Sequence, residues 1–308
     1  MCANATGLHQ IPRPTQDRAT ADIVFVHGLG GASHDTWRHG KESDPDHFFW
    51  PEALAAELSG CHVWTFGYDA GITQLGSPGM RIGQRAGSLA IQMKNRGLGS
   101  RPVIFVTHSM GGLVIKSLIC DRPEGECAEL IGNIRGIVFC GTPHSGSAFA
   151  SAAEVLGNFL KVAKTQKHVE EMCRDDVALN QMHDRFRAWH HTHPLAIQTY
   201  AESRSLFTKS LLGRWIDLGL VVPRPSANTG LGDSPVDVDA DHIELVKPHP
   251  GNKPLYDTVY LGVLWFIRQI LDLSREPQKQ PKDVDLADFF RLFESVQVTI
   301  LISPTRTP

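Results

Sequence analysis

Residues 103–116 constrain the fold of this chain more than any other stretch of its sequence. They begin with a short run of apolar residues, a pattern typical of a strand that is buried on both faces of a parallel sheet. An apolar helical pattern follows at once, so that Ser109 lies in a sharp turn between strand and helix. Such a turn lifts a serine hydroxyl above the end of a sheet, where an acyl group can approach it. The segment therefore predicts that Ser109 is a nucleophile.

The residues around this serine match the usual G-x-S-x-G pattern only in part. Small residues are needed two positions before and two positions after the serine, because the strand and helix backbones crowd there. Gly111 meets this requirement, whereas Thr107 meets it only partly. The pattern is therefore insufficient by itself, and the rest of the chain must supply a histidine, a carboxylate and two backbone N–H donors.

Strand patterns alternate with helical patterns along most of the chain. This alternation predicts an α/β protein with a doubly wound, mostly parallel sheet. Strands are expected at residues 23–26, 61–66, 103–106, 134–140 and 195–200, with a weaker one at 221–222. Helices are expected at residues 50–58, 82–93, 113–120 and 256–273.

The same patterns indicate how the chain is organised into segments. We expect an irregular segment over residues 1–20, followed by one domain over residues 21–273. Residues 145–190 are helical in pattern and interrupt the late strands, so we expect them to form a cap over the site. Residues 274–308 combine a charged linker with a strand-like apolar tail.

Composition argues against several classes of protein. The net charge is −3, and no basic stripe of the kind that binds nucleic acid is present. Six cysteines without metal-type spacing, and an N-terminus without the pattern of a secretory signal, favour a cytoplasmic protein. No apolar run approaches the roughly 20 residues that span a bilayer. Any membrane contact is therefore expected to be peripheral, and the oligomeric state is left open.

His242 is the histidine best placed to act as a general base. Where a serine occupies a strand-to-helix turn of this kind, the order along the chain is serine, acid, histidine. His242 comes late enough for this order and lies between the last strand pattern and the closing helix. His144 is the rival, but no acid fits between it and Ser109. We expect His144 to line the pocket or to support the cap.

The acid is harder to assign than the base. It should leave the end of a strand between Ser109 and His242, where it can fix the tautomer of the imidazole and stabilise the imidazolium. Glu202 follows the strand pattern at residues 195–200 directly and is favoured. Asp217, which precedes the weaker strand pattern, stays as the alternative acid.

Backbone N–H groups are needed to stabilise an oxyanion. One donor is expected at Met110, the residue after the serine. The other is expected at Leu29, in the glycine-rich loop that follows the first buried strand. The side chains and backbone expected to contact the substrate belong to His27, Gly28, His108 and His144.

Two signals for a cofactor are weak. Gly28 and Gly30 follow a strand as in a dinucleotide-binding loop, but Ser33 stands where the third glycine is required. The histidines within residues 190–193 lack a nearby set of cysteines or carboxylates. We therefore expect neither a metal ion nor another cofactor.

Several of these segments, in this order, resemble one known family. They include residues 25–31, 107–116 and 141–147, followed by the Tyr-x-Glu segment that ends at Glu202 and by Asp241-His242. The set resembles the α/β-hydrolase domain of the "serine active site containing protein" family. It is more distantly similar to GPI inositol-deacylases and to hydrolase domains fused to NACHT ATPases in NLR-like proteins. The resemblance covers about residues 20–272.

This resemblance implies an α/β-hydrolase fold with Ser109 as nucleophile, His242 as base and Glu202 as acid, and it makes Thr107 acceptable. It implies a serine esterase or lipase-like acyl hydrolase that acts on a small-molecule or lipid ester, with a role in lipid metabolism. Transfer of the acyl group to an acceptor alcohol is a chemically close side activity. The alternative is a catalytically silent or regulatory module of the same fold, in a defence-signalling context.

Overall fold

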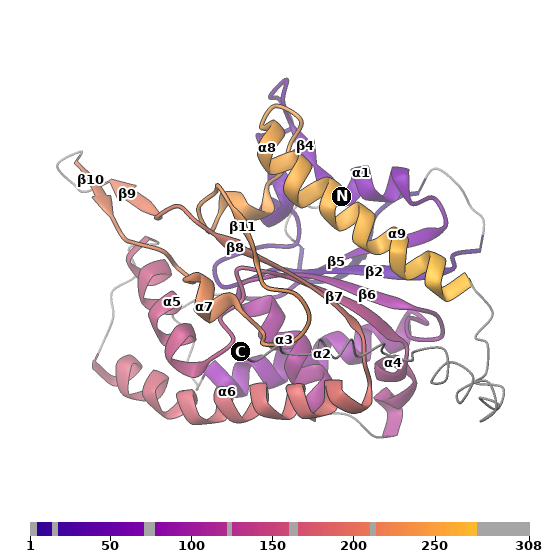
Figure 1. Ribbon diagram of the computed structural model, residues 1–308, viewed down its shortest axis with the longest axis horizontal. Helices are drawn as coiled ribbons and strands as arrows, with labels where there is room; N and C mark the ends of the chain where they lie inside the picture. Colours follow the sequence, from indigo (N-terminus) through magenta and orange to yellow (C-terminus); the bar gives the residue numbers. More distant parts are fainter. Residues whose placement is uncertain are drawn as a thin grey trace, which may run out of the picture. The chain divides into compact units, whose positions relative to one another are not determined.

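A mostly parallel, seven-stranded sheet forms the centre of the described part of the chain (Figure 1). The computed structural model describes residues 5–13, 18–70, 78–121, 125–159, 166–209 and 214–275. The strand order is β1 (Gly7–Gln10), β5 (Cys61–Gly67), β2 (Ala21–Val26), β6 (Val103–His108), β7 (Ile134–Cys140), β8 (Ala196–Glu202) and β11 (Val236–Val238). β1 is antiparallel to β5, and the other neighbouring pairs are parallel. The predicted doubly wound architecture is confirmed.

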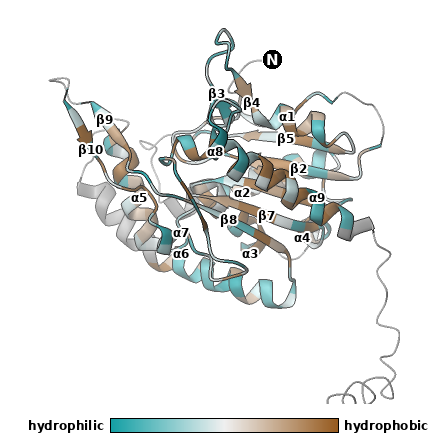
Figure 2. Ribbon diagram, turned by 45° about the horizontal axis from the view of Figure 1, so that its top comes forward, coloured by the Kyte–Doolittle hydropathy of each residue, from teal (hydrophilic) through white to brown (hydrophobic). Residues whose placement is uncertain are grey.

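Helices cover both faces of the sheet (Figure 1). On one face, α2 (Pro78–Asn95), α3 (Met110–Asp121) and α6 (Gln166–Thr192) share a buried apolar cluster with β2, β6 and β7. On the other face, α1 (Trp50–Glu57) and α9 (Gly262–Arg275) share a second cluster with the alternate residues of the same strands. Val24 and Phe25, for example, enter different clusters. Because both faces are covered, these strands are apolar along nearly their whole length, as Figure 2 shows.

The shorter elements lie in the connections between these strands and helices. The remaining helical segments of the described residues are α4 (Ala128–Gly132), α5 (Gly146–Phe159), α7 (Arg224–Ala227) and α8 (Lys253–Leu255), with 3-10 turns at Asp35–Trp37, Gly125–Cys127 and Glu244–Val246 and a π-helix at Tyr256–Leu261. Two small antiparallel pairs stand apart from the main sheet: β3 (Arg38–His39) with β4 (Phe48–Phe49), and β9 (Phe207–Lys209) with β10 (Trp215–Asp217).

The strand order places the carboxyl ends of β2 and β6 side by side. In the register of the two strands, Val26 lies opposite Thr107. From β2 the chain moves outward to β5, whereas from β6 it moves in the opposite direction to β7. The loops that follow β2 and β6 therefore diverge at this point, which is where open α/β sheets bind their ligands.

Two strands differ from the sequence-based prediction. Residues 1–20 are predicted to be irregular, yet β1 pairs with β5 and buries Leu8 against the core. The alternation of buried and exposed residues in β1 is too short to be recognised in the sequence, because Leu8 is the one buried residue of this strand. The weak strand predicted at residues 221–222 is a bend instead, and the last strand is β11. Val221 and Val222 are apolar because they pack with Leu206 and Ala227 in a separate cluster.

The helical insertion predicted over residues 145–190 consists of α5 and α6. α6 packs along α2 and α3, and so contributes to the helical layer on one face of the sheet. α5 ends beside a pocket, where Leu156 and Phe159 form part of the wall. The part of the insertion next to the site is therefore the end of α5.

Most of the segment predicted at residues 274–308 lies beyond the last described helix, α9. Residues Met1–Leu271 form one compact unit, and α9 continues to Arg275. The linker and strand-like tail predicted for residues 274–308 lie, from residue 276 onward, outside the described residues. Among the helices that the structure describes, none combines the length and the hydropathy needed to cross a bilayer.

Candidate active site

Ser109 occupies a one-residue turn between a buried strand and a helix. β6 ends at His108 and α3 begins at Met110. The φ angle of Ser109 is 52°, and no other non-glycine residue in the described part of the chain has a positive φ. This left-handed conformation costs an L-residue about 1 kcal/mol or more and persists only where the surroundings enforce it. The backbone N–H of Ser109 donates a hydrogen bond of 2.9 Å to the carbonyl of Cys140, which ties the turn to the end of β7.

Two glycines let neighbouring backbones approach this turn. A Cβ atom at Gly28 would lie 2.5 Å from the Cβ of Ser109 and 3.2 Å from its Oγ. A Cβ atom at Gly111 would lie 2.1 Å from the carbonyl oxygen of Val26. Side chains cannot be accommodated at these distances, so glycine is required on both sides of the serine.

Thr107 fits the position where the usual pattern has glycine. Its side chain is fully buried, and its Oγ1 donates a hydrogen bond of 2.8 Å to the carbonyl oxygen of Val138 on β7. A buried hydroxyl is tolerated when it has a partner of this kind. The departure from the pattern is therefore accommodated by the neighbouring strand.

A buried histidine and a buried carboxylate form a pair at the same edge of the sheet. Nδ1 of His242 lies 2.7 Å from Oε2 of Glu202, and both side chains are fully buried. Glu202 ends β8, and His242 follows β11. The other carboxylate oxygen of Glu202 accepts a hydrogen bond of 2.8 Å from the backbone N–H of Val222. The carboxylate thus fixes Nδ1 as the protonated nitrogen of a neutral imidazole and leaves Nε2 as the basic one.

This pair lies against the serine turn. A Cβ atom at Gly141, the residue after Cys140, would be 3.0 Å from Nδ1 of His242 and 3.1 Å from Oε2 of Glu202. The rings of His108 and His242 are 4.7 Å apart between their centroids, and Nε2 of His108 donates to the carbonyl of His242 at 2.9 Å. Nε2 of His242 is buried and has no hydrogen-bond partner among the described residues. The arrangement leaves Nε2 of His242 unpaired within the described part of the chain, in a ring that contacts His108, the residue before Ser109.

Asp217, the alternative acid, lies elsewhere. It ends β10, is exposed to solvent, and accepts a hydrogen bond of 2.8 Å from the backbone N–H of Gly219. The Nδ1 atom of His242, which an acid would have to hold, is already bonded to Glu202. The structure therefore pairs His242 with Glu202 and not with Asp217.

The loop after β2 carries the predicted oxyanion donor Leu29 and is held rigidly. Gly30 donates to the carbonyl of Ala70 at 3.0 Å, and Gly31 donates to the carbonyl of Gly28 at 3.2 Å. Met110, the other predicted donor, is the first residue of α3, and N–H groups in a first helical turn have no partner within their helix. Met110 follows Ser109 in the chain, and Leu29 follows Gly28, whose backbone approaches the serine.

His27 supports this loop. Nδ1 of His27 donates to the carbonyl of Gly28 at 2.9 Å, Nε2 accepts from the backbone N–H of Tyr68 at 3.2 Å, and the ring stacks on the Tyr68 ring. Burial lowers the pKa of His27 to about 4, so the ring is neutral near pH 7. Both ring nitrogens of His27 are used in holding the loop, and its contact with a substrate stays a prediction.

His144 contacts a buried lysine that also binds α6, part of the predicted cap. Its Nδ1 accepts a hydrogen bond of 2.6 Å from Nζ of Lys116, and the same amine donates to Nδ1 of His183 at 2.8 Å. Lys116 is fully buried, and burial lowers its pKa to about 7. Burial and the nearby lysine lower the pKa of His144 well below its ordinary value. These three side chains tie α3, the loop after β7 and α6 together.

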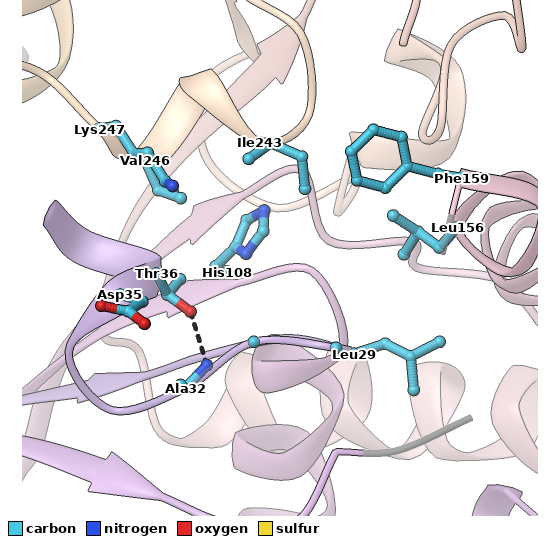
Figure 3. Close-up of a pocket in the computed structure, with 12 residues that line it drawn as sticks. Leu29, Ala32, Asp35, Thr36, His108, Leu156, Phe159, Ile243, Val246 and Lys247 are labelled. Atoms are coloured by element: carbon cyan, nitrogen blue, oxygen red, sulfur yellow. Dashed lines mark hydrogen bonds between the residues drawn. The ribbon is translucent and has the colours of Figure 1, made fainter. Parts of the chain in front are cut away.

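A pocket of about 250 Å³ opens beside the serine turn (Figure 3). His108 stands between its two ends. The side chains at one end are apolar and belong to Leu29, Leu156, Phe159 and Ile243. Those at the other end are mostly polar or charged and belong to Asp35, Thr36, Val246 and Lys247. Of the residues predicted to contact a substrate, His108 lines this pocket, and Gly28 lies between Ser109 and the lining residue Leu29.

No protein-family model matches the chain. The curated Protein SERAC1 of Danio rerio is 31% identical over 262 residues, which are 79% of this chain and 38% of that protein. Protein SERAC1 of Homo sapiens is 30% identical over 274 residues, or 83% of this chain and 40% of that protein. The chain thus spans less than half the length of the curated relatives it matches.

Solved structures share the arrangement of strands and helices. A haloalkane dehalogenase DbeA-M1 loop variant from Bradyrhizobium elkanii aligns with a TM-score of 0.50 and 12% identity, covering 87% of this chain and 98% of that one. The chain has the α/β-hydrolase fold. The mature Bacillus licheniformis lipase BlEst2 aligns with a TM-score of 0.48 and 18% identity, covering 83% of this chain and 97% of that one.

In the α/β-hydrolase fold, nucleophile, acid and histidine come in that order along the chain. Ser109, Glu202 and His242 follow β6, end β8 and follow β11. The pocket residues Asp35, Thr36 and Lys247 and the buried cluster around Lys116 were not predicted from the sequence. A lysine inside an otherwise apolar helical run was a signal for the cluster, whereas the polar pocket residues carry no local signal.

Other histidines of the chain lie outside the pocket wall. His190 bonds to the carbonyl of Leu195, and His193 stacks on Trp189, so both have structural contacts at the end of α6. A group with ligand atoms close enough for a metal ion is formed, within the described ranges, by His39, Asp46 and His249 on the surface. The rings of His39 and His249 are stacked 3.4 Å apart, so their in-plane lone pairs do not converge on one point.

Proposed function

We propose that this chain is a serine hydrolase that cleaves carboxylic esters through Ser109, His242 and Glu202. The observation that carries the proposal is the buried pair of Glu202 and His242 beside a serine in a left-handed turn. Burying an imidazole and a carboxylate together costs free energy, and folds retain such pairs where function requires them. The free Nε2 of His242 supplies the base that an activated serine needs.

The reaction proceeds in two steps that use the same groups. In the first step, Nε2 of His242 accepts the proton of Ser109 as Oγ attacks the ester carbonyl. The oxyanion is stabilised by the N–H groups of Leu29 and Met110, and the imidazolium then protonates the leaving alcohol. In the second step, His242 activates water, which releases the acid from the acyl-enzyme. Glu202 stays ionised and stabilises the imidazolium in both steps.

The pocket supports an ester with an apolar acyl group and a polar alcohol portion. Leu156 and Phe159 offer an apolar wall for an acyl chain, whereas Lys247 and Asp35 offer charge at the opposite end. Small-molecule esters and lipid esters both have this division. An acceptor alcohol that enters at the polar end in place of water turns the hydrolysis into acyl transfer.

The similarity to Protein SERAC1 supports membership of the "serine active site containing protein" family and a role in lipid acyl chemistry. Free thiols at Cys61, Cys120, Cys127 and Cys140 support a reducing compartment such as the cytoplasm. Neither property is needed for the chemistry proposed for Ser109.

A fluorophosphonate probe tests the proposal directly. The wild-type chain should form a covalent adduct on Ser109, detected by peptide mass spectrometry, and Ser109→Ala should form none. The wild type should also hydrolyse p-nitrophenyl butyrate. If folded wild-type protein forms no adduct and turns over no ester between pH 6 and pH 9, the chain is a silent module of this fold and the proposal is wrong.

A further inference from the structure

The hairpin formed by β9 and β10 exposes an unusual share of apolar surface. The described residues contain seven exposed large apolar side chains, and three of them belong to this hairpin. Phe207 is 47% exposed, Trp215 is 67% exposed and Ile216 is 44% exposed. The two strands pair only with each other and extend beyond the end of the main sheet (Figure 1). Exposed apolar groups gathered in this way mark an interaction surface.

Both faces of this hairpin carry apolar residues. Trp215 pairs with Lys209 and Asp217 pairs with Phe207, so these four side chains share one face of the ribbon. Ile216 pairs with Thr208 on the opposite face. A flat protein partner would cover one face and leave the other in water. A lipid phase that surrounds the ribbon covers both faces.

The charges on the hairpin suit an anionic lipid surface. Nζ of Lys209 lies over the ring of Trp215 at 4.7 Å from its centroid. Tryptophan and lysine or arginine are the residues that anchor proteins at the level of lipid headgroups, because their apolar bodies and polar ends face different media. Arg214 adds a second basic residue beside Trp215, whereas the acidic Asp217 is at the other end of β10. Residues 210–213 lie outside the described residues.

The base of the hairpin is continuous with the apolar end of the pocket. Leu206 and Leu218 flank the two strands and are joined by a backbone hydrogen bond of 2.9 Å. Leu206 belongs to a buried cluster with Leu156, against which Phe159 and Ile243 also pack. Those last three side chains line the pocket. A largely buried apolar cluster therefore joins the base of the hairpin to the proposed acyl site.

The hairpin is also joined to the proposed acid. The chain leaves the sheet after Glu202, forms the hairpin and then passes Glu202 again at Val222, whose N–H donates to the Glu202 carboxylate. We propose that the β9–β10 hairpin docks the protein on an anionic phospholipid surface, with Phe207, Trp215 and Ile216 inserted among the lipids. Docking would deliver lipid esters to the pocket, so this role rests on the proposed ester hydrolysis. Docking itself can be measured without turnover.

Flotation with phospholipid vesicles tests the docking. The full chain should bind vesicles that contain phosphatidylglycerol in phosphatidylcholine. The triple variant F207S/W215S/I216S should bind these vesicles with an affinity at least about tenfold lower. Trp265→Ser is the matched control, because Trp265 is 62% exposed on α9 and its loss should leave binding unchanged. If the triple variant does not fold, Trp215→Ser carries the same comparison with a smaller expected loss.

A charge variant tests the choice of lipid. Lys209→Glu should weaken binding to the phosphatidylglycerol vesicles by about fivefold or more at low salt, and much less at high salt. Its binding to pure phosphatidylcholine vesicles should be unchanged. Equal effects on both kinds of vesicle would overturn the assignment to an anionic surface.

Three results would overturn the docking itself. The first is absence of the wild type from the floated vesicles, and the second is equal binding by the hairpin variants and Trp265→Ser. A hairpin variant could also convert a dimer into a monomer without lipid, which would make the hairpin an interface between copies of this chain. Failure of the proposed function gives a different result. If the protein binds vesicles but forms no fluorophosphonate adduct, the docking proposal stands and the proposed hydrolase activity is wrong. Turnover of p-nitrophenyl butyrate should be unchanged in Trp215→Ser.

Discussion

Glu202 and His242 hold each other at 2.7 Å in the interior, although their positions are separated by a hairpin, a short helix and a strand. The backbone N–H of Val222 occupies the second carboxylate oxygen. Because both oxygens are used, the carboxylate cannot rotate away from the imidazole. The pair is therefore an oriented unit before any substrate binds.

This orientation predicts different effects for two matched acid-to-amide changes. Glu202→Gln should lower kcat on p-nitrophenyl butyrate by about 10³- to 10⁴-fold, because a neutral amide cannot stabilise the imidazolium. Asp217→Asn, on the exposed β10, should leave kcat within about twofold. Steady-state kinetics on both purified variants decide the matter. A large loss in Asp217→Asn with none in Glu202→Gln would reverse the assignment.

The left-handed turn at Ser109 predicts a difference between two inactive variants. Ser109→Gly should have a free energy of unfolding about 1 kcal/mol greater than Ser109→Ala, because glycine adopts a φ of 52° without a steric penalty. Urea unfolding monitored by tryptophan fluorescence measures both values. Equal stabilities would indicate that the turn is not strained.

The close approach of the β2 loop to the serine predicts the outcome of adding one methyl group. Gly28→Ala should lower kcat/KM at least about 100-fold, because the new Cβ would meet the Cβ of Ser109 at 2.5 Å and displace the nucleophile or the oxyanion donor. Gly132→Ala is the control, since a Cβ there would meet nothing within 4 Å. Ester kinetics and circular dichroism on both variants separate lost catalysis from lost folding. Normal turnover in Gly28→Ala would argue against this loop as an oxyanion site.

The buried amine of Lys116 predicts a pH-dependent stability. Burial lowers its pKa to about 7 in the folded protein, whereas the unfolded chain keeps a value near 10.4. Between these pH values the unfolded state binds more protons, so the stability of the wild type rises with pH. The free energy of unfolding of the wild type, relative to Lys116→Met, should therefore increase from pH 7 to pH 10, by at most about 1.4 kcal/mol per pH unit.

Urea unfolding at several pH values measures this difference. His144 and His183 stay neutral in the folded protein throughout this range, since burial lowers the pKa of His144 well below its ordinary value and that of His183 to about 3. Lys253→Met, at an exposed lysine of α8, is the control and should follow the wild type. Parallel curves for the wild type and Lys116→Met would contradict the lowered pKa.

The central strands and the serine turn are predictable because their signals are local. A strand covered on both faces must be apolar throughout, and β2, β6 and β7 have this pattern. The position of Glu202 at a strand end is also visible in the sequence. The sequence indicates its partner, His242, only through the order of serine, acid and histidine along the chain. This order does not determine which of these residues lie close together in space.

The features that sequence reasoning missed are short or depend on distant contacts. β11 contains three residues, too few for a periodicity, and its pairing with β8 is what makes it a strand. The contact of Lys116 with His144 and His183 joins three separate elements. The hydrogen bonds of the His27 ring to Gly28 and Tyr68 likewise depend on a contact between separate segments.

Different stretches of the chain supply the residues proposed to perform the chemistry and the residues proposed to select the substrate. Ser109 and Glu202 stand at the ends of sheet strands, whereas the apolar pocket wall and the exposed hairpin come from the connections after β7 and β8. Connections tolerate replacement far better than the strands they join. Exchanging α5 or residues 203–221 for the corresponding segment of a relative is thus a route to an enzyme with the same reaction and a new substrate range, which makes these two segments the natural starting points for engineering.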